Sequence, residues 1–114
     1  MRKNLTREER LKGGTEINHV FKNPERMSRC KEARLLACHN NLKVNRFAVV
    51  PIKKMGIAVK RNYAKRIFKE IYRKLKCRIN DGYDIVVIAY SGEYGYFERE
   101  EHFVDLIRKA DIAK

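Results

Sequence analysis

Residues 47–70 read FAVVPIKKMGIAVKRNYAKRIFKE and join a predicted strand to a predicted amphipathic helix. The apolar run at 47–52 is typical of a strand, and Pro51 favours an edge position or a strand end, because proline cannot donate a hydrogen bond to a neighbouring strand. From about residue 57 to 79, apolar residues recur at helical spacing. One face of this helix collects apolar side chains: Ala64, Ile67, Phe68, Ile71 and Leu75. The opposite face collects basic ones: Lys65, Arg66, Lys69, Arg73 and Lys76.

Further elements are predicted on either side of this stretch. Residues 34–39 weakly resemble a strand, which would pair with 47–52 as a hairpin with a long loop. The continuous apolar run DIVVIAY at 84–90 suits a central strand. Two more helices are predicted, over 15–21 with Thr15 as its cap and over 97–109. The fold class is therefore α+β, with helices packed on a small sheet.

The length and composition fit one small globular domain. Residues 1–114 are enough for a single modest core, and the hydrophobic fraction of 44% is that of a folded protein. Residues 1–9 are polar and are expected to be flexible. No signal peptide is expected, and no apolar run is long enough to span a bilayer, so no membrane partner is predicted. Three cysteines without a regular spacing predict free thiols and a cytoplasmic protein.

The positive charge is concentrated in one segment. The chain has 27 Lys and Arg against 14 Asp and Glu, a formal net charge of +13. Residues 53–78 contain eleven basic side chains and one acid, Glu70, so most of the excess lies there. Acids at i+4 scarcely balance these charges, and salt bridges along the helix therefore do not explain them. A rigid cationic helix of this kind predicts binding to a polyanion, with several phosphates neutralised at once.

The same segment resembles the protein component of bacterial ribonuclease P. That family carries a strand ending in paired lysines, then Gly and Ala-Val, then an Arg-Asn-Arg helix followed by further basic residues and an acid. The matching positions here are Lys53, Lys54, Gly56, Ala58, Val59, Arg61, Asn62, Lys65, Arg66, Lys69 and Glu70. INHVF at 17–21, DIVVIA at 84–89 and LIRKADI near the end extend the resemblance over roughly residues 10–111. Tyr63 stands where the family has its second arginine, and offers a stacking surface in place of a bidentate phosphate ligand.

The resemblance implies both a fold and a function. The fold would be a ribosomal-protein-like α+β domain with an about four-stranded sheet and a left-handed β-α-β crossover. The function would be that of the protein subunit of ribonuclease P, which assists Mg²⁺-dependent removal of the 5′ leader from precursor tRNA. The catalyst would be the partner RNA, which would bind most of the Mg²⁺, and the protein would join it as a monomer in a 1:1 complex.

The resemblance also assigns site residues. The RNA-binding residues would be Lys53, Lys54, Lys60, Arg61, Asn62, Tyr63, Lys65, Arg66 and Lys69. The leader of the precursor would lie in a cleft lined by Phe21 and Ile17. No catalytic or metal-ligating residue of the protein itself is predicted.

Alternative functions and sites stay open at this point. A structural, ribosomal-type RNA-binding protein would share the charge, and a DNA-binding protein could place the basic helix in a major groove. An intrinsic nuclease is disfavoured because His19, His39 and His102 lie on separate predicted elements. Cys38 beside His39 lacks a second ligand pair for a metal. The aromatic residues at 94–97 are interpreted as a packed loop, with nucleotide stacking as the alternative.

Overall fold

The computed structural model describes residues 9–11 and 13–114. Its elements are, in chain order, α1 (Gly13–Lys22), β1 (Arg26–Arg29), β2 (Ala33–His39), β3 (Arg46–Pro51), η2 (Lys53–Met55), α2 (Ala58–Leu75), η3 (Lys76–Arg78), β4 (Tyr83–Ala89) and α3 (Tyr96–Lys109). Three α-helices and one mixed sheet confirm the predicted α+β class. The radius of gyration of 13.0 Å is that of one compact domain of this length.

The central position of β4 makes the predicted hairpin between residues 34–39 and 47–52 wrong. The strand order is β1-β2-β4-β3, so β4 separates the two strands of that hairpin. Val86 of β4 has Leu36 of β2 as its antiparallel partner and Ala48 of β3 as its parallel partner. The physical reason is that β4 is apolar on both faces, and such a strand buries most surface when strands and helices cover it on every side. Pro51 ends β3 at a sheet edge, as predicted.

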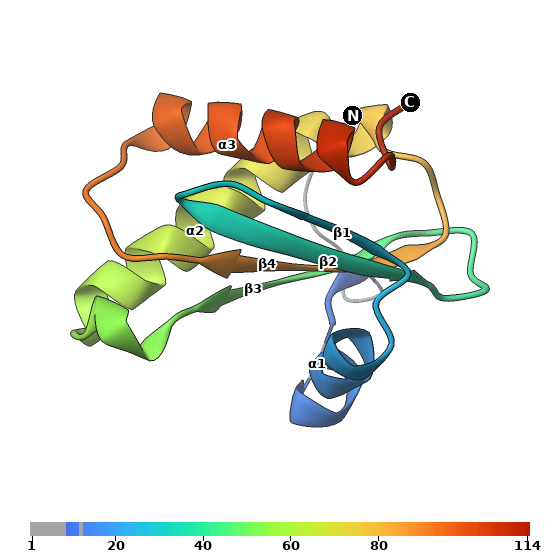
Figure 1. The fold of residues 1–114 in the computed structure, drawn as a ribbon, viewed down its shortest axis with the longest axis horizontal. Helices are drawn as coiled ribbons and strands as arrows, with labels where there is room; N and C mark the ends of the chain where they lie inside the picture. The colour runs from blue at the N-terminus through green and yellow to red at the C-terminus, as the bar shows by residue number, and fades with distance from the viewer. Residues whose placement is uncertain (1–8, 12) are drawn as a thin grey trace.

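The helices cover both faces of the sheet. Figure 1 shows α2 and α3 on one face and α1 on the other. The larger core lies under α2 and α3, where Phe68 and Phe103 are fully buried. A smaller core lies under α1 and is centred on Val20 and Val86. The side chains of β2, β3 and β4 alternate between these two cores, as the period of a strand requires.

The crossover from β3 through α2 to β4 fixes the position of the basic helix. β3 and β4 are parallel neighbours, so the chain must cross the sheet between them, and α2 makes that crossing. The ring of Phe47 on β3 stacks on Tyr72 of α2, with centroids 4.3 Å apart and planes 4° apart. Burial raises the pKa of Tyr72 far above its usual value, so this phenol stays neutral. The left-handed sense of the crossover stays a prediction from the resemblance.

Several element boundaries differ from the prediction. α1 begins at Gly13, so Thr15 lies within the helix instead of capping it. α2 ends at Leu75, and one 3-10 turn completes the segment that was predicted as a helix to residue 79. Strand β1 was not predicted, because RMSR is mostly polar and shows no alternation of apolar residues. Its half-buried and exposed side chains alternate at the edge of the sheet. Of the segment 1–9, only Glu9 is among the described residues.

A charged network at one end of the sheet holds α1 in place. The guanidinium of Arg46 donates to both oxygens of Asp84, with Nε–Oδ1 2.8 Å and Nη2–Oδ2 2.7 Å. Its third donor, Nη1, reaches Glu16 of α1 at 2.6 Å. Asp84 also accepts from Asn40 Nδ2 at 3.0 Å. The hydrogen bond to Asp84 is the main cause that raises the pKa of Arg46.

Candidate RNA interface

The face of α2 that points away from the core forms a groove rich in cations. The buried face of α2 consists of the residues predicted for it together with Tyr72. The groove, which we call the basic groove, has a volume of about 640 Å³ and is lined by Arg10, Asn62, Lys65, Arg66, Lys69, Glu70 and Arg73. Five of these seven side chains are cationic and one is acidic. A groove with this composition suits phosphate oxygens, which accept hydrogen bonds from lysine and arginine.

Two of the basic residues near the C-terminal end of α2 are instead engaged by carboxylates. Lys74 Nζ lies 2.8 Å from Glu100 of α3, and Lys76 Nζ lies 3.1 Å from Glu9. The hydrogen bond that Lys74 Nζ donates to Glu100 is the main cause that raises the pKa of Lys74. Lys76 was predicted on the basic face, but the carboxylate of Glu9 neutralises its positive charge. The surplus positive charge on α2 therefore lies nearer its middle than its end.

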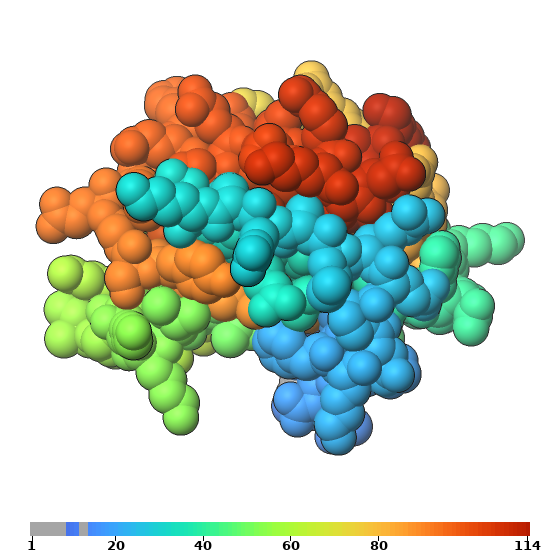
Figure 2. Space-filling view, viewed as in Figure 1, coloured from blue at the N-terminus to red at the C-terminus, as the bar shows by residue number. Residues whose placement is uncertain are grey.

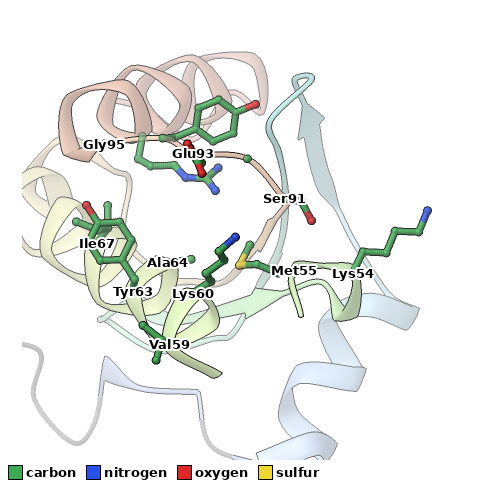
Figure 3. Close-up of a pocket in the computed structure, with 13 residues that line it drawn as sticks. Lys54, Met55, Val59, Lys60, Tyr63, Ala64, Ile67, Ser91, Glu93 and Gly95 are labelled. Carbon is green, nitrogen blue, oxygen red and sulfur yellow. The ribbon is translucent and has the colours of Figure 1, made fainter. Parts of the chain in front are cut away.

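A second hollow, which we call the aromatic cavity, lies on the flank of α2. Its volume is about 540 Å³, and it is bounded by η2, by α2 and by the loop of residues 91–95. Figure 3 shows Tyr63, Lys60 and Ala64 on the α2 side, with the loop segment that carries Glu93 across from them. Lys54 lies at the rim. Seven of the nine predicted RNA-binding residues therefore divide between two hollows, because Lys60 and Tyr63 lie on a different side of the helix from Lys65 and its neighbours.

Tyr63 lies between the two hollows. Its side chain lines the aromatic cavity, and the guanidinium of Arg66, which lines the basic groove, lies 5.7 Å from its ring centroid. The residue is 42% exposed, which is high for an aromatic side chain on a helix that packs on a core. One ring therefore borders both surfaces.

Two predicted RNA-binding residues have other positions. Arg61 is half-buried, and its Nη1 donates to the backbone oxygen of Ile52 at 3.2 Å. This hydrogen bond ties the first turn of α2 to the end of β3, so Arg61 has a structural role that the sequence did not indicate. Lys53 is exposed on η2 but lines neither hollow.

The groove also contains residues that were not predicted as ligands. Arg73 follows Lys69 by one helical turn, and the helical spacing alone could have added it to the site. Arg10 gives no such signal, since a bridge between Arg10 and Phe47 brings it beside β3, far along the chain. Only the folded backbone reveals that contribution.

The two residues predicted for the leader cleft lie on the opposite face of the sheet. Phe21 is 37% exposed on α1, and Ile17 packs partly against the smaller core. Figure 2 shows the surface hollowed between α1 and the segment that leads from β3 into α2. The partly buried side chains of Val50 and Ile88 belong to the same side of the sheet. The predicted leader residues therefore belong to α1 and its face of the sheet, whereas all the residues of the basic groove except Arg10 belong to α2.

The described residues contain neither a cluster of metal-ligating side chains nor a membrane-spanning helix. Among them, no three His, Cys, Asp or Glu side chains gather into a group that could hold a metal ion. No helix within the described ranges is long and apolar enough to cross a membrane. His39, 2.7 Å from Glu25, is the last residue of β2, whereas His102 lies 3.8 Å from Glu32, which directly precedes β2, so these two histidines lie at opposite ends of that strand.

Comparison with known proteins identifies the family. The family model described as Ribonuclease P matches residues 5–111. This chain belongs to the ribonuclease P protein family. A ribonuclease P protein component from Clostridium botulinum is 35% identical over 93% of this chain and 97% of its own length. Another from Thermotoga petrophila is 38% identical over 77% of this chain and 74% of its own.

Solved structures of ribonuclease P proteins have the same fold. The RNase P protein from Thermotoga maritima superposes with a TM-score of 0.79 at 26% identity, covering 91% of this chain and 97% of that one. The RNase P protein from Staphylococcus aureus gives 0.83 at 22% identity, which shows a shared fold, over 93% and 98%. The chain is therefore a protein subunit of ribonuclease P, an endoribonuclease complex of tRNA processing, and ribonuclease P RNA is its partner. The family match therefore rejects the two alternatives, a ribosomal-type RNA-binding protein and a DNA-binding protein.

Proposed function

We propose that the basic groove docks on the ribonuclease P RNA while the α1 side of the sheet holds the 5′ leader of precursor tRNA. The observation that carries the proposal is the groove itself, where five cations from α2 and the N-terminal segment line one surface beside a single acid. Cations spaced along a rigid helix neutralise successive phosphates without ordering a flexible loop. The proposal includes a 1:1 complex of one protein with one RNA.

In this arrangement the protein itself would not be catalytic. Its contribution would be electrostatic, since two polyanions, ribozyme and substrate, repel each other, and a chain of net charge +13 that touches both lowers the repulsion. Mg²⁺ would be held mainly by RNA phosphates, and the lysines and arginines of the groove would reduce the number of ions needed. The three free cysteines support a reducing, cytoplasmic location.

The proposal predicts that the protein supports cleavage when Mg²⁺ is scarce. Mixed with a bacterial ribonuclease P RNA and a precursor tRNA at limiting Mg²⁺, it should raise the cleavage rate by about tenfold or more, a barrier lower by about 1.4 kcal/mol. Single-turnover cleavage across a Mg²⁺ series measures this. An oligolysine of equal charge is the control, and a similar stimulation by that peptide would reject a specific protein interface.

A second prediction concerns the leader side. Replacing Phe21 by alanine should weaken binding of a precursor tRNA to the holoenzyme about fivefold, because one base–aromatic stack contributes about 1 kcal/mol. Affinity for mature tRNA, which has no leader, should not change. Phe97→Ala removes a ring that is 74% exposed on α3 and is the matched control. Equal weakening of precursor and mature tRNA by Phe21→Ala would contradict a leader contact.

A further inference from the structure

We propose that the aromatic cavity binds one unpaired nucleobase of an RNA strand whose phosphates lie in the basic groove. The inference rests on the proposed function, because it assumes that RNA occupies the groove. The inference adds a contact with the face of a base to the contacts that the basic groove makes with the RNA backbone. The expected ligand is a nucleotide of single-stranded RNA, with its base inside the cavity and its phosphate at the rim.

The size and lining of the cavity fit a nucleobase. Its volume of about 540 Å³ lies within the range of small-molecule sites and leaves room for a base and its ribose. Ala64 and Ile67 of α2 are buried at its floor, and Met55 of η2 adds a further apolar side chain. A flat heterocycle buries its faces against such a lining, whereas a bare phosphate would lose hydration there without a partner.

Tyr63 provides the stacking surface. Arg66 lies over its ring from the groove, and the ring also lines the cavity. Val59, on the same edge of the cavity, is 75% exposed. Exposed apolar side chains on a helix that otherwise carries cations are unfavourable in water, and a base placed on Tyr63 would cover them.

The positive charge around the opening favours RNA, which carries phosphates, over a ligand without negative charge, such as an apolar peptide. In Figure 3 the side chain of Lys60 extends into the cavity, where it could contact the phosphate of the bound nucleotide, whereas Lys54 at the rim points outward and adds positive charge to the approach. Glu93 of the loop would repel a phosphate placed deep in the cavity, but its carboxylate could accept a hydrogen bond from an N–H group of a base. These charges match a nucleotide that enters base first.

Contacts within the protein fix the far wall of the cavity, with no need for a bound ligand. Arg99, 3% exposed, donates from Nη2 to the oxygen of Tyr90 at 3.0 Å and from Nη1 to that of Glu32 at 3.1 Å. Its guanidinium also lies 4.6 Å from the ring centroid of Tyr94. Gly92 adopts φ +151°, and a Cβ there would lie 2.3 Å from the Tyr94 ring, so only glycine allows this close approach. A wall fixed in this way would lose little entropy when a base binds.

The test compares two strands of equal charge. An eight-nucleotide single-stranded oligoadenylate and an abasic ribose-phosphate chain of the same length are titrated into the full chain, and the ratio of their Kd values is the base preference. Tyr63→Leu should lower this preference by about fivefold or more, as expected for one lost stack. Tyr63→Phe, which keeps a ring, should retain it, and so should Phe97→Leu on α3. Thermal melts confirm that each variant is folded.

The outcomes separate the two proposals. A base preference that is unchanged in Tyr63→Leu, or absent from the unmodified protein, overturns the cavity as a base site. If the abasic chain still binds with strong salt dependence in that case, the basic groove keeps its proposed role. If neither strand binds in a salt-dependent way, both the cavity and the groove proposals fail.

Discussion

Replacing Lys65, Arg66 and Lys69 together by glutamine should weaken binding to ribonuclease P RNA by about 100-fold at moderate salt. All three line the basic groove, and their loss removes three phosphate contacts of about 1 kcal/mol each. The slope of log affinity against log salt should fall by roughly 2–3, since each neutralised phosphate contributes about 0.7–0.9. Filter binding over a salt series measures both quantities. Arg61 is left unchanged because its hydrogen bond to Ile52 supports the fold.

The matched control removes the same charge elsewhere. Arg29, Lys31 and Arg108 are exposed on or near β1 and on α3. β1 forms the edge of the sheet opposite to β3, so these cations lie away from the groove, and interactions beyond about 10 Å are screened at moderate salt. Their replacement by glutamine should change affinity by less than about threefold. Equal losses in the two triple variants would show that total charge, and not the groove, determines binding.

Arg46→Ala should destabilise the protein by about 3 kcal/mol. The variant leaves Asp84, whose side chain is 5% exposed, with only Asn40 as a hydrogen-bond partner among the groups described above. An uncompensated charge in such a site typically costs about 3–5 kcal/mol, and the lower value applies because Arg46 itself is partly exposed. The free energy of unfolding in urea measures the loss, and the melting temperature should fall by about 10 °C.

The control for this prediction is Arg26→Ala. Arg26 also pairs with an aspartate, Asp111, but at 3.7 Å and with both side chains well exposed. Exposed pairs of this kind contribute little, so the free energy of unfolding should change by less than about 0.5 kcal/mol. If the two variants lose the same stability, burial of Asp84 is not what gives the Arg46 network its strength.

The fold could be predicted as far as local periodicity determines it. The buried face of α2 follows from a spacing of 3.6 residues, and the apolar run of β4 identifies an interior strand. The neighbours of that strand do not follow, since pairing depends on contacts between segments far apart in sequence. β2 and β3 are close in the chain and were assumed to pair, whereas β4 gains more burial between them. β1 carries no apolar pattern because an edge strand needs none.

The site was predictable in composition but not in arrangement. Charge density singled out α2, and the family resemblance supplied the individual positions, of which Asn62, Lys65, Arg66 and Lys69 line one groove. The division into two hollows depends on the loop at residues 91–95, which comes from a distant part of the chain. The same holds for Arg10 and for the hydrogen bond of Arg61, because both depend on where β3 lies.

The placement of the last strand in the middle of the sheet has a consequence during translation. β3 ends at Pro51, but its only strand partner within the described residues, β4, is complete only at Ala89. At a synthesis rate of about 5–20 residues per second, the nascent chain spends roughly 2–8 s with β3 made and unpaired. During that interval a strongly cationic helix precursor and an unsatisfied strand edge emerge together beside ribosomal RNA. Formation of the complete sheet is therefore expected to await synthesis of β4, and a ribosome stalled before residue 83 would display no native sheet beyond β1 and β2.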